Sequence, residues 1–126
     1  MLLARISLIA SSLLYGAVGI WFLADPDGAA RVVDIALQTP SARVDFRATY
    51  GGLNLALAGL LLAAGLRPDR HARSGLILQV ATFAGYAGAR IFGMAAEFAV
   101  PPLMPLLLAF EITGIVTGLL ALKRLP

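Results

Sequence analysis

Residues 44–65, VDFRATYGGLNLALAGLLLAAG, decide the class of this protein. The second half of the stretch is almost entirely Leu, Ala and Gly, and about 20 mostly apolar residues suffice for a helix to cross a bilayer. The first turns, by contrast, carry Asp45, Arg47, Tyr50 and Asn54. Charged side chains within a membrane are costly and usually face a protein interior or a water-filled cavity. The stretch therefore predicts a spanning helix whose polar end has a role.

The composition of the whole chain supports a membrane protein. Its 126 residues are 60% hydrophobic and 13% charged, whereas soluble domains are roughly half apolar and about a quarter charged. The length predicts a single domain over residues 1–126. The chain has no cysteine, which excludes disulfides, thiolate chemistry and cysteine metal sites. The net charge of +3 does not indicate nucleic-acid binding, because the basic residues lie between hydrophobic spans.

Three further segments have the length and composition of a span. The four predicted spans cover residues 6–24, 46–66, 75–96 and 103–122. Between the first two, GAARVVDIALQTP (residues 28–40) favours a short helix at the membrane interface. Thr39 and Pro40 are typical of an N-cap and first-turn pair, so the second helix is expected to begin before it enters lipid. The predicted fold is an all-α integral membrane four-helix bundle with one short interfacial helix.

The charged residues outside the spans predict the orientation. Arg5, the segment RPDRHARS (residues 67–74) and Lys123 with Arg124 share one side, while most acidic residues share the other. The positive-inside rule then places both termini and residues 67–74, an expected loop, in the cytoplasm of a bacterial inner membrane. His71 is interpreted as a solvated loop residue, because no second metal ligand accompanies it at helical spacing. Neither a metal nor a cofactor is predicted.

The charged residues within the spans are predicted to lie at one level. At about 1.5 Å per residue, Arg90 and Glu111 each lie about two turns from the outer end of their span. Arg47 and Tyr50 lie within the first two turns of the second span. Because buried charges in membranes usually pair, we expect an Arg90–Glu111 pair and a second pair between Arg47 and a carboxylate.

Helical phase gathers these polar side chains on one face of each span. They predict an outward-opening polar pocket built from Arg47, Tyr50, Asn54, Tyr86, Arg90, Glu97 and Glu111. Asp45 falls on the opposite side of its helix from Arg47. It is expected to serve a neighbouring helix or the interfacial segment, and it is a further candidate for ligand binding.

Three functions are compatible with this pocket. The first is binding of an amphipathic small molecule or lipid with an anionic or carbonyl head, because arginine binds anionic groups bidentately. The second is a non-catalytic accessory or scaffold subunit whose buried charges fix the arrangement of the helices. The third is an intramembrane isomerase or cyclase with Glu111 as the general acid or base. In that case Tyr50 or Tyr86 would stabilise an oxyanion.

The third span has a second face made of small residues. Ala81, Gly85, Ala89 and Gly93 recur every four residues, and such a ladder lets helix backbones approach closely. This face is predicted to serve either an internal contact or a contact with a second copy or another membrane protein. The predicted partners are therefore the lipid bilayer, a hydrophobic or amphipathic small molecule and a protein on this face, but not nucleic acid.

The stretch DFRATYGGLNLALAG (residues 45–59) resembles a family of short bacterial membrane proteins described as domain of unknown function 4345. Members of that family have four spans, an acid-x-Arg-Ala-x-Tyr-Gly-Gly signature opening the second, an arginine late in the third and a glutamate in the fourth. The corresponding residues here are Asp45, Arg47, Ala48, Tyr50, Gly51, Gly52, Arg90 and Glu111. The resemblance covers essentially the whole chain and implies the fold and the polar site, but no reaction. A looser similarity to DoxX-like four-helix proteins implies an accessory or redox-partner role.

Overall fold

The computed structural model describes residues 1–125, and within that range the chain forms helices and no strands. The elements are α1 (Leu2–Ala24), α2 (Pro26–Val32), α3 (Pro40–Phe46), the π-helix η1 (Arg47–Gly52), α4 (Leu53–Leu66), α5 (Pro68–Ala96) and α6 (Met104–Lys123). In the described part of the chain, four helical units are long and apolar enough to cross a membrane: α1, the continuous α3–η1–α4 unit, α5 and α6. The predicted all-α fold with four spans is confirmed.

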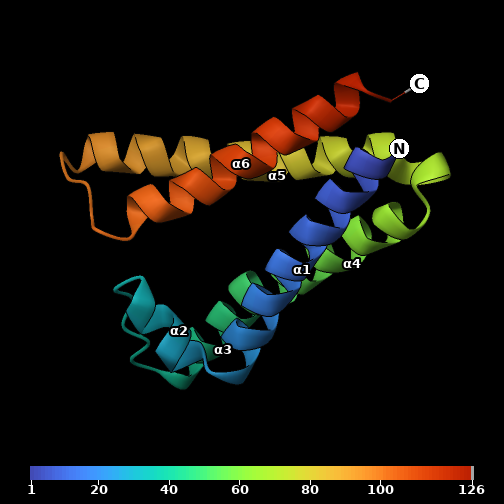
Figure 1. Ribbon diagram of the computed structural model, residues 1–126. Coiled ribbons are helices and arrows are strands. Elements are labelled where there is room, and N and C mark those ends of the chain that lie inside the picture. The colour runs from blue at the N-terminus through green and yellow to red at the C-terminus, as the bar shows by residue number, and fades with distance from the viewer. Residues whose placement is uncertain (126) are drawn as a thin grey trace.

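The helices form two antiparallel pairs that diverge from a common end (Figure 1). The first pair is α1 with α4, and the second is α5 with α6. The pairs meet where the N-terminus, the α4–α5 junction and the end of α6 lie together. They separate toward α2, α3 and the α5–α6 connection, so the space between the pairs widens in that direction.

The hydrophobic core lies where the two pairs meet. Leu8 of α1, Leu61 of α4 and Leu76 of α5 are fully buried there. A small residue allows this approach, because a Cβ at Gly75 would lie only 2.5 Å from the Cβ of Ala64 and 3.0 Å from Leu8 Cδ2. Close backbone approach at small residues is a common way for membrane helices to associate.

A buried amide side chain links the two helix pairs by hydrogen bonds at the end where the pairs meet. Gln79 of α5 is 0% exposed, and its Nε2 donates to the carbonyl of Gly114 at 2.9 Å and to Ser7 Oγ at 2.8 Å. The Ser7 hydroxyl also donates to Thr117 Oγ1 at 3.3 Å. Because a buried polar group without partners costs free energy, these bonds make the joint between α1, α5 and α6 specific.

The second spanning unit begins at Pro40, as the Thr39–Pro40 pair predicts. Thr39 Oγ1 accepts a hydrogen bond from the amide of Ala42 at 3.1 Å, and Pro40 occupies the first helical position. The preceding short helix, predicted within the segment of residues 28–40, is present as α2 and overlaps the beginning of that segment. α2 begins after the Asp25 N-cap and ends at Val32. Asp34 then adopts a positive φ of 58°, which stops the helix.

The π-helix η1 was not predicted. It contains the residues of the RATYGG sequence, and the side-chain amide of Asn54 donates to the carbonyl of Tyr50 within it. α1 passes close to this segment, because a Cβ at Gly51 would lie 2.7 Å from Leu23 Cγ. Single π-helical turns inside α-helices occur frequently at functional sites.

The predicted loop before the third span requires correction. The segment RPDRHARS is not a loop, since α5 begins at Pro68 rather than near residue 75. Pro68 at the first helical position and Asp69 in the first turn both favour a helix start. His71 is therefore an exposed residue on the first turns of α5.

The predicted ladder of small residues on α5 makes no close packing contact within the described chain. Ala81, Gly85 and Ala89 are exposed, and Gly93 is half-buried. A Cβ at Gly85 or Gly93 would meet no described atom within 4 Å. The close internal contacts are made elsewhere, as at Gly75, so a partner for this ladder stays a prediction.

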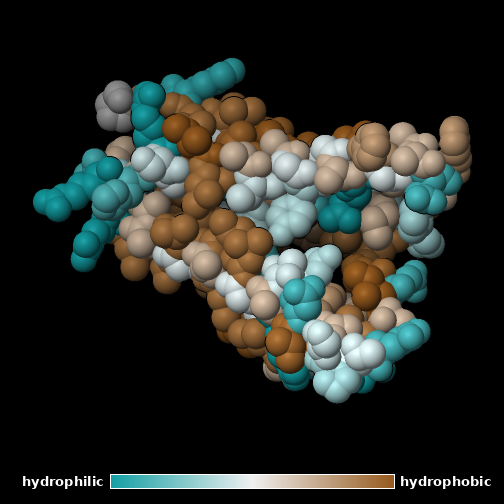
Figure 2. All heavy atoms as spheres, turned by 180° about the vertical axis from the view of Figure 1, so that it is seen from behind, coloured by the Kyte–Doolittle hydropathy of each residue, from teal (hydrophilic) through white to brown (hydrophobic). Residues whose placement is uncertain are grey.

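The outer surface has the character expected of a multi-pass membrane protein. Large apolar side chains such as Leu13, Leu60 and Phe92 are well exposed on the spans. Hydrophilic side chains gather mainly at the two ends, and apolar surface covers much of the region between them (Figure 2). Because many large apolar residues lie on the outside of the helices in addition to those in the core, the natural surroundings of this surface are lipid chains.

Candidate intramembrane binding site

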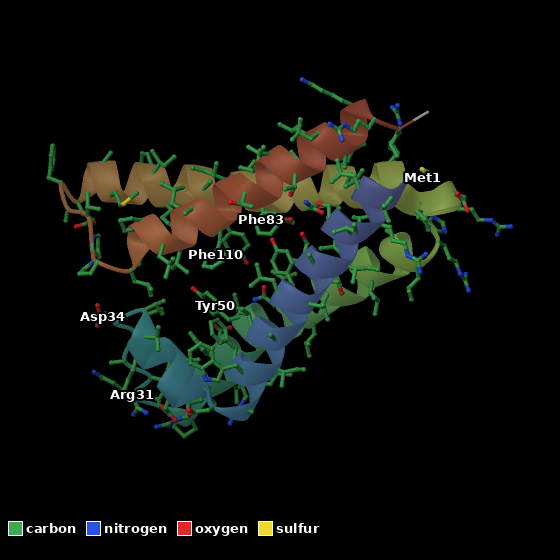
Figure 3. All side chains as sticks on the ribbon, in the orientation of Figure 1. Met1, Arg31, Asp34, Tyr50, Phe83 and Phe110 are labelled. Atoms are coloured by element: carbon green, nitrogen blue, oxygen red, sulfur yellow. The ribbon has the colours of Figure 1, made fainter. Side chains whose placement is uncertain are left out.

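A cavity of about 510 Å³ lies between the diverging helix pairs. Its walls come from α1, η1 with α4, α5 and α6, and residues 29–35 contribute to it beside the wide end. Most lining side chains are apolar, and the polar ones are Tyr15, Tyr50, Asn54, Tyr86, Arg90 and Glu111. Tyr50 and Phe110 lie on opposite sides of the opening between the pairs (Figure 3). A mostly apolar cavity with a few convergent polar groups is typical of a small-molecule site.

Arg90 and Glu111 form the charged centre of the cavity. Arg90 Nε donates to both carboxylate oxygens of Glu111 at 3.1 Å, and Nη2 donates to Oε1 at 2.6 Å. The two side chains are 19% and 9% exposed. The predicted pair is therefore present, and it joins α5 to α6 beside the cavity. The remaining guanidinium nitrogen, Nη1, donates to the Sδ of Met104 at 3.1 Å.

The Tyr50 ring is held in an aromatic cluster. Its ring centroid lies 4.6 Å from that of Phe46 and 5.9 Å from that of Phe22, and those two rings are 5.3 Å apart. Tyr50 and Tyr86 are 39% and 38% exposed, so both residues are partly open at the cavity. Asn54 is buried and bonded to the backbone of η1, so it supports this wall of the cavity.

Tyr15 is a lining residue that the pocket predicted from the sequence did not contain. Its side chain is 5% exposed, and its ring centroid lies 5.3 Å from that of Phe83. The Tyr15 hydroxyl is buried and makes no hydrogen bond of good geometry within residues 1–125, although the Thr82 side chain lies near it. An unpaired buried hydroxyl costs about 1–3 kcal/mol. Tyr15 lies nearer the middle of its span than the residues from which the pocket was predicted, yet it lines the same cavity.

Arg47 lies outside the cavity lining, although the sequence predicted it within the pocket. Its Nε donates to the carbonyl of Leu23 at 3.0 Å, not to a carboxylate. Arg47 is the first residue of η1, whose wider turn breaks the regular α-helical spacing that placed Arg47 on one face with Tyr50 and Asn54. The carboxylate pair on this part of the chain belongs instead to Arg43, which binds Asp27 at 2.9 Å on the surface.

The two remaining candidates also lie apart from the cavity. Glu97 is exposed at the C-cap of α5, and Phe98 follows with a positive φ of 49° that turns the chain away. Asp45 is exposed on α3 and does not line the cavity. The structure thus brings together Tyr50, Asn54, Tyr86, Arg90 and Glu111 but not Arg47, Glu97 or Asp45.

The charged groups of the described chain are not arranged as a metal centre. No group of three or more His, Asp or Glu side chains in residues 1–125 is placed to hold a metal ion. The chemistry available in the cavity is hydrogen bonding from hydroxyl, amide and guanidinium groups, next to one carboxylate.

A known protein family matches the chain over most of its length. The model of a family described as Domain of unknown function (DUF4345) matches residues 3–122. The chain belongs to this family. In this DUF4345 protein, Arg47 to Gly52 form the π-helix, and Arg90 and Glu111 form the buried ion pair. The residues on which the resemblance was based therefore include a lining tyrosine and both charges of the cavity. No curated protein and no solved structure matches the chain.

Proposed function

We propose that this protein binds an amphipathic small molecule or lipid within the membrane, with a carbonyl or anionic head beside Arg90 and Glu111 and an apolar tail along the helices. The observation that carries the proposal is the 510 Å³ cavity, in which polar side chains from four helical units converge within mostly apolar walls. Such a cavity suits a ligand that is itself divided into a polar and an apolar part.

The ion pair alone would not require a ligand. Buried pairs can serve only to specify how helices pack, which is the alternative of an accessory or scaffold subunit. A purely structural pair needs neither a cavity of this size nor the partly exposed tyrosines beside it. These features favour binding over a scaffold role.

We further propose that the protein resides in a bacterial inner membrane with its cavity toward the outer half. The arginines at the α4–α5 junction support a cytoplasmic position for that end through the positive-inside rule. Since the chain has no native cysteine, Arg70→Cys and Asp34→Cys would each carry a unique thiol. A membrane-impermeant maleimide applied to intact cells should label Asp34→Cys but not Arg70→Cys, and the reverse pattern would invert the proposed orientation.

The binding proposal is tested by identifying molecules that copurify with the protein from the membrane. The wild type, purified with minimal detergent, should carry a bound molecule that native mass spectrometry detects as an added mass. The Arg90→Met/Glu111→Leu double variant removes both charges together and should remain folded but lose that mass. The matched control is Arg43→Met/Asp27→Leu, which removes an exposed pair outside the cavity and should keep it.

A scaffold role predicts a different result. The wild type would then carry no specific added mass, and the Arg90/Glu111 double variant would differ from it only in stability. Retention of the same bound molecule by the double variant would also contradict binding at this pair.

A further inference from the structure

The cavity is electrically balanced before any ligand enters. Among the described residues that line it, Arg90 and Glu111 are the only charged ones, and each compensates the other. An anionic head would have to displace Glu111 from Arg90 or enter as an extra charge beside a carboxylate. Both alternatives are costly where water is scarce. The electrostatics therefore favour an uncharged head.

Two polar groups in the cavity are poorly satisfied by the protein itself. Arg90 Nη1 donates to the thioether of Met104, although thioether sulfur is a weak acceptor. The Tyr15 hydroxyl, on a residue that is 5% exposed, makes no hydrogen bond of good geometry within residues 1–125. A carbonyl or hydroxyl oxygen is the uncharged group that would accept from such donors.

A second hollow continues the cavity along the molecule. It has a volume of about 230 Å³ and lies mainly between α1 and α6, and we call it the α1–α6 groove. Leu14, Phe83 and Phe110 line both the cavity and the groove, so the two spaces are adjoining. Most of the groove is apolar, and Ile6 and Ala10 line it on α1. Its mostly apolar lining suits a hydrocarbon chain.

We propose that the α1–α6 groove holds the hydrocarbon chain of a lipid whose uncharged head, bearing a carbonyl or hydroxyl oxygen, lies beside Arg90 in the cavity. This inference rests on the proposed function and narrows it to one class of ligand. The occupant is a neutral lipid because the cavity already balances its own charge, and a single-chain one because the adjoining groove has a volume of only about 230 Å³.

The head is tested with two probes that share one chain. Monooleoylglycerol and oleate are offered together to the purified protein at mildly alkaline pH, where oleate is ionised, and bound masses are counted by native mass spectrometry. Monooleoylglycerol should be preferred on the order of tenfold. Preference for oleate would overturn the uncharged head and leave the binding function intact. Binding of neither probe at the cavity would count against the proposed function itself.

The groove is tested with chain length and a blocking substitution. Ala10→Phe adds a ring on the exposed α1 side of the groove, and the matched control Ala84→Phe adds the same ring on an exposed part of α5 outside both hollows. Ala10→Phe should weaken monooleoylglycerol on the order of tenfold and leave monohexanoylglycerol unchanged, while Ala84→Phe should change neither. In the wild type the oleoyl compound should bind more tightly than the hexanoyl one. Equal binding of the two, or no effect of Ala10→Phe, would overturn the groove as the chain site.

Discussion

Arg90 Nε donates a hydrogen bond to each carboxylate oxygen of Glu111, both at 3.1 Å, across the interface of α5 and α6. Arg43 Nε likewise donates to both oxygens of Asp27, at 3.1 and 2.9 Å, but Arg90 adds a further bond from Nη2 to Glu111 Oε1 at 2.6 Å. The environments differ, because the Arg90 and Glu111 side chains are 19% and 9% exposed, whereas those of Arg43 and Asp27 are 37% and 42% exposed. The chain thus carries two arginine–carboxylate pairs of related geometry, one largely buried and one more open to its surroundings.

A substitution in the buried Arg90–Glu111 pair should lower the free energy of unfolding more than one in the exposed Arg43–Asp27 pair. Arg90→Met leaves the Glu111 carboxylate buried without its partner and should lower the free energy of unfolding by on the order of 3 kcal/mol. Asp27→Asn, at the exposed pair, should cost about 1 kcal/mol or less. Denaturant unfolding in mixed micelles, followed by circular dichroism, measures both variants against the wild type.

The Arg90→Met/Glu111→Leu double variant supplies the control for that comparison. It removes the uncompensated charge and should recover most of the loss, since apolar replacements of buried pairs are often tolerated. Equal destabilisation by Arg90→Met and Asp27→Asn would mean that the buried setting of the pair has no energetic effect.

The joint between the two helix pairs should be sensitive to single methyl groups. Gly75→Ala places a Cβ 2.5 Å from Ala64 Cβ, and the cost of overpacking is typically about 1–3 kcal/mol. Gly59→Ala, where no described atom lies within 4 Å of the new Cβ, should be neutral or stabilising by up to about 1 kcal/mol. Thermal unfolding of the two variants compares them directly. A Gly75→Ala protein as stable as Gly59→Ala would contradict this packing.

The Arg90–Glu111 pair could be predicted from the sequence because a charged side chain surrounded by lipid needs an oppositely charged partner. Arg90 and Glu111 lie at the same depth on neighbouring spans, and a charge in a bilayer requires a partner. The N-cap at Thr39 was equally accessible, because the Thr–Pro pair acts through local geometry alone. Both predictions depend on short-range physics that a single sequence contains.

The errors arose where tertiary packing overrides local periodicity. Arg47 was placed in the pocket by counting about 100° per residue, and the π-helix of residues 47–52 breaks that count. No sequence pattern shows that the helix pairs diverge, so the predicted pocket was limited to residues near the outer ends of the spans and did not include Tyr15. His71 was assigned to a loop because the charged segment separates two apolar spans, although Pro68 and Asp69 are local signals of a helix start. None of these features has a periodic signal in the sequence.

Removal of the Tyr15 hydroxyl should have opposite effects on the stability of the protein and on its affinity for ligand. Tyr15→Phe removes a buried group that makes no hydrogen bond of good geometry in residues 1–125 and should stabilise the ligand-free protein by about 1 kcal/mol. If a ligand oxygen satisfies this hydroxyl, the same variant should weaken binding about tenfold. Tyr86→Phe, with its partly exposed side chain, should leave stability unchanged. Thermal shift without ligand and native mass spectrometry with it separate the two effects, and a destabilised Tyr15→Phe would show that its hydroxyl is already satisfied.

The stability of the π-helix η1 should depend on the side chain of Asn54. The amide of Asn54 donates to the Tyr50 carbonyl inside η1, and Asn54→Leu would leave that carbonyl without this donor in apolar surroundings. Hydrogen exchange of residues 47–52, measured by mass spectrometry, should therefore quicken markedly. Ser12→Ala is the matched control, because Ser12 Oγ donates to the Ala58 carbonyl at 2.8 Å in the same helix pair but outside η1.

Exchange in residues 47–52 should rise little in the Ser12→Ala protein. Since Tyr50 projects from η1 into the cavity wall, the Asn54→Leu protein should also lose ligand affinity, even though Asn54 is bonded to backbone. Unchanged exchange in the Asn54→Leu protein would mean that α1, which packs against Gly51, holds the π-helix without help from Asn54.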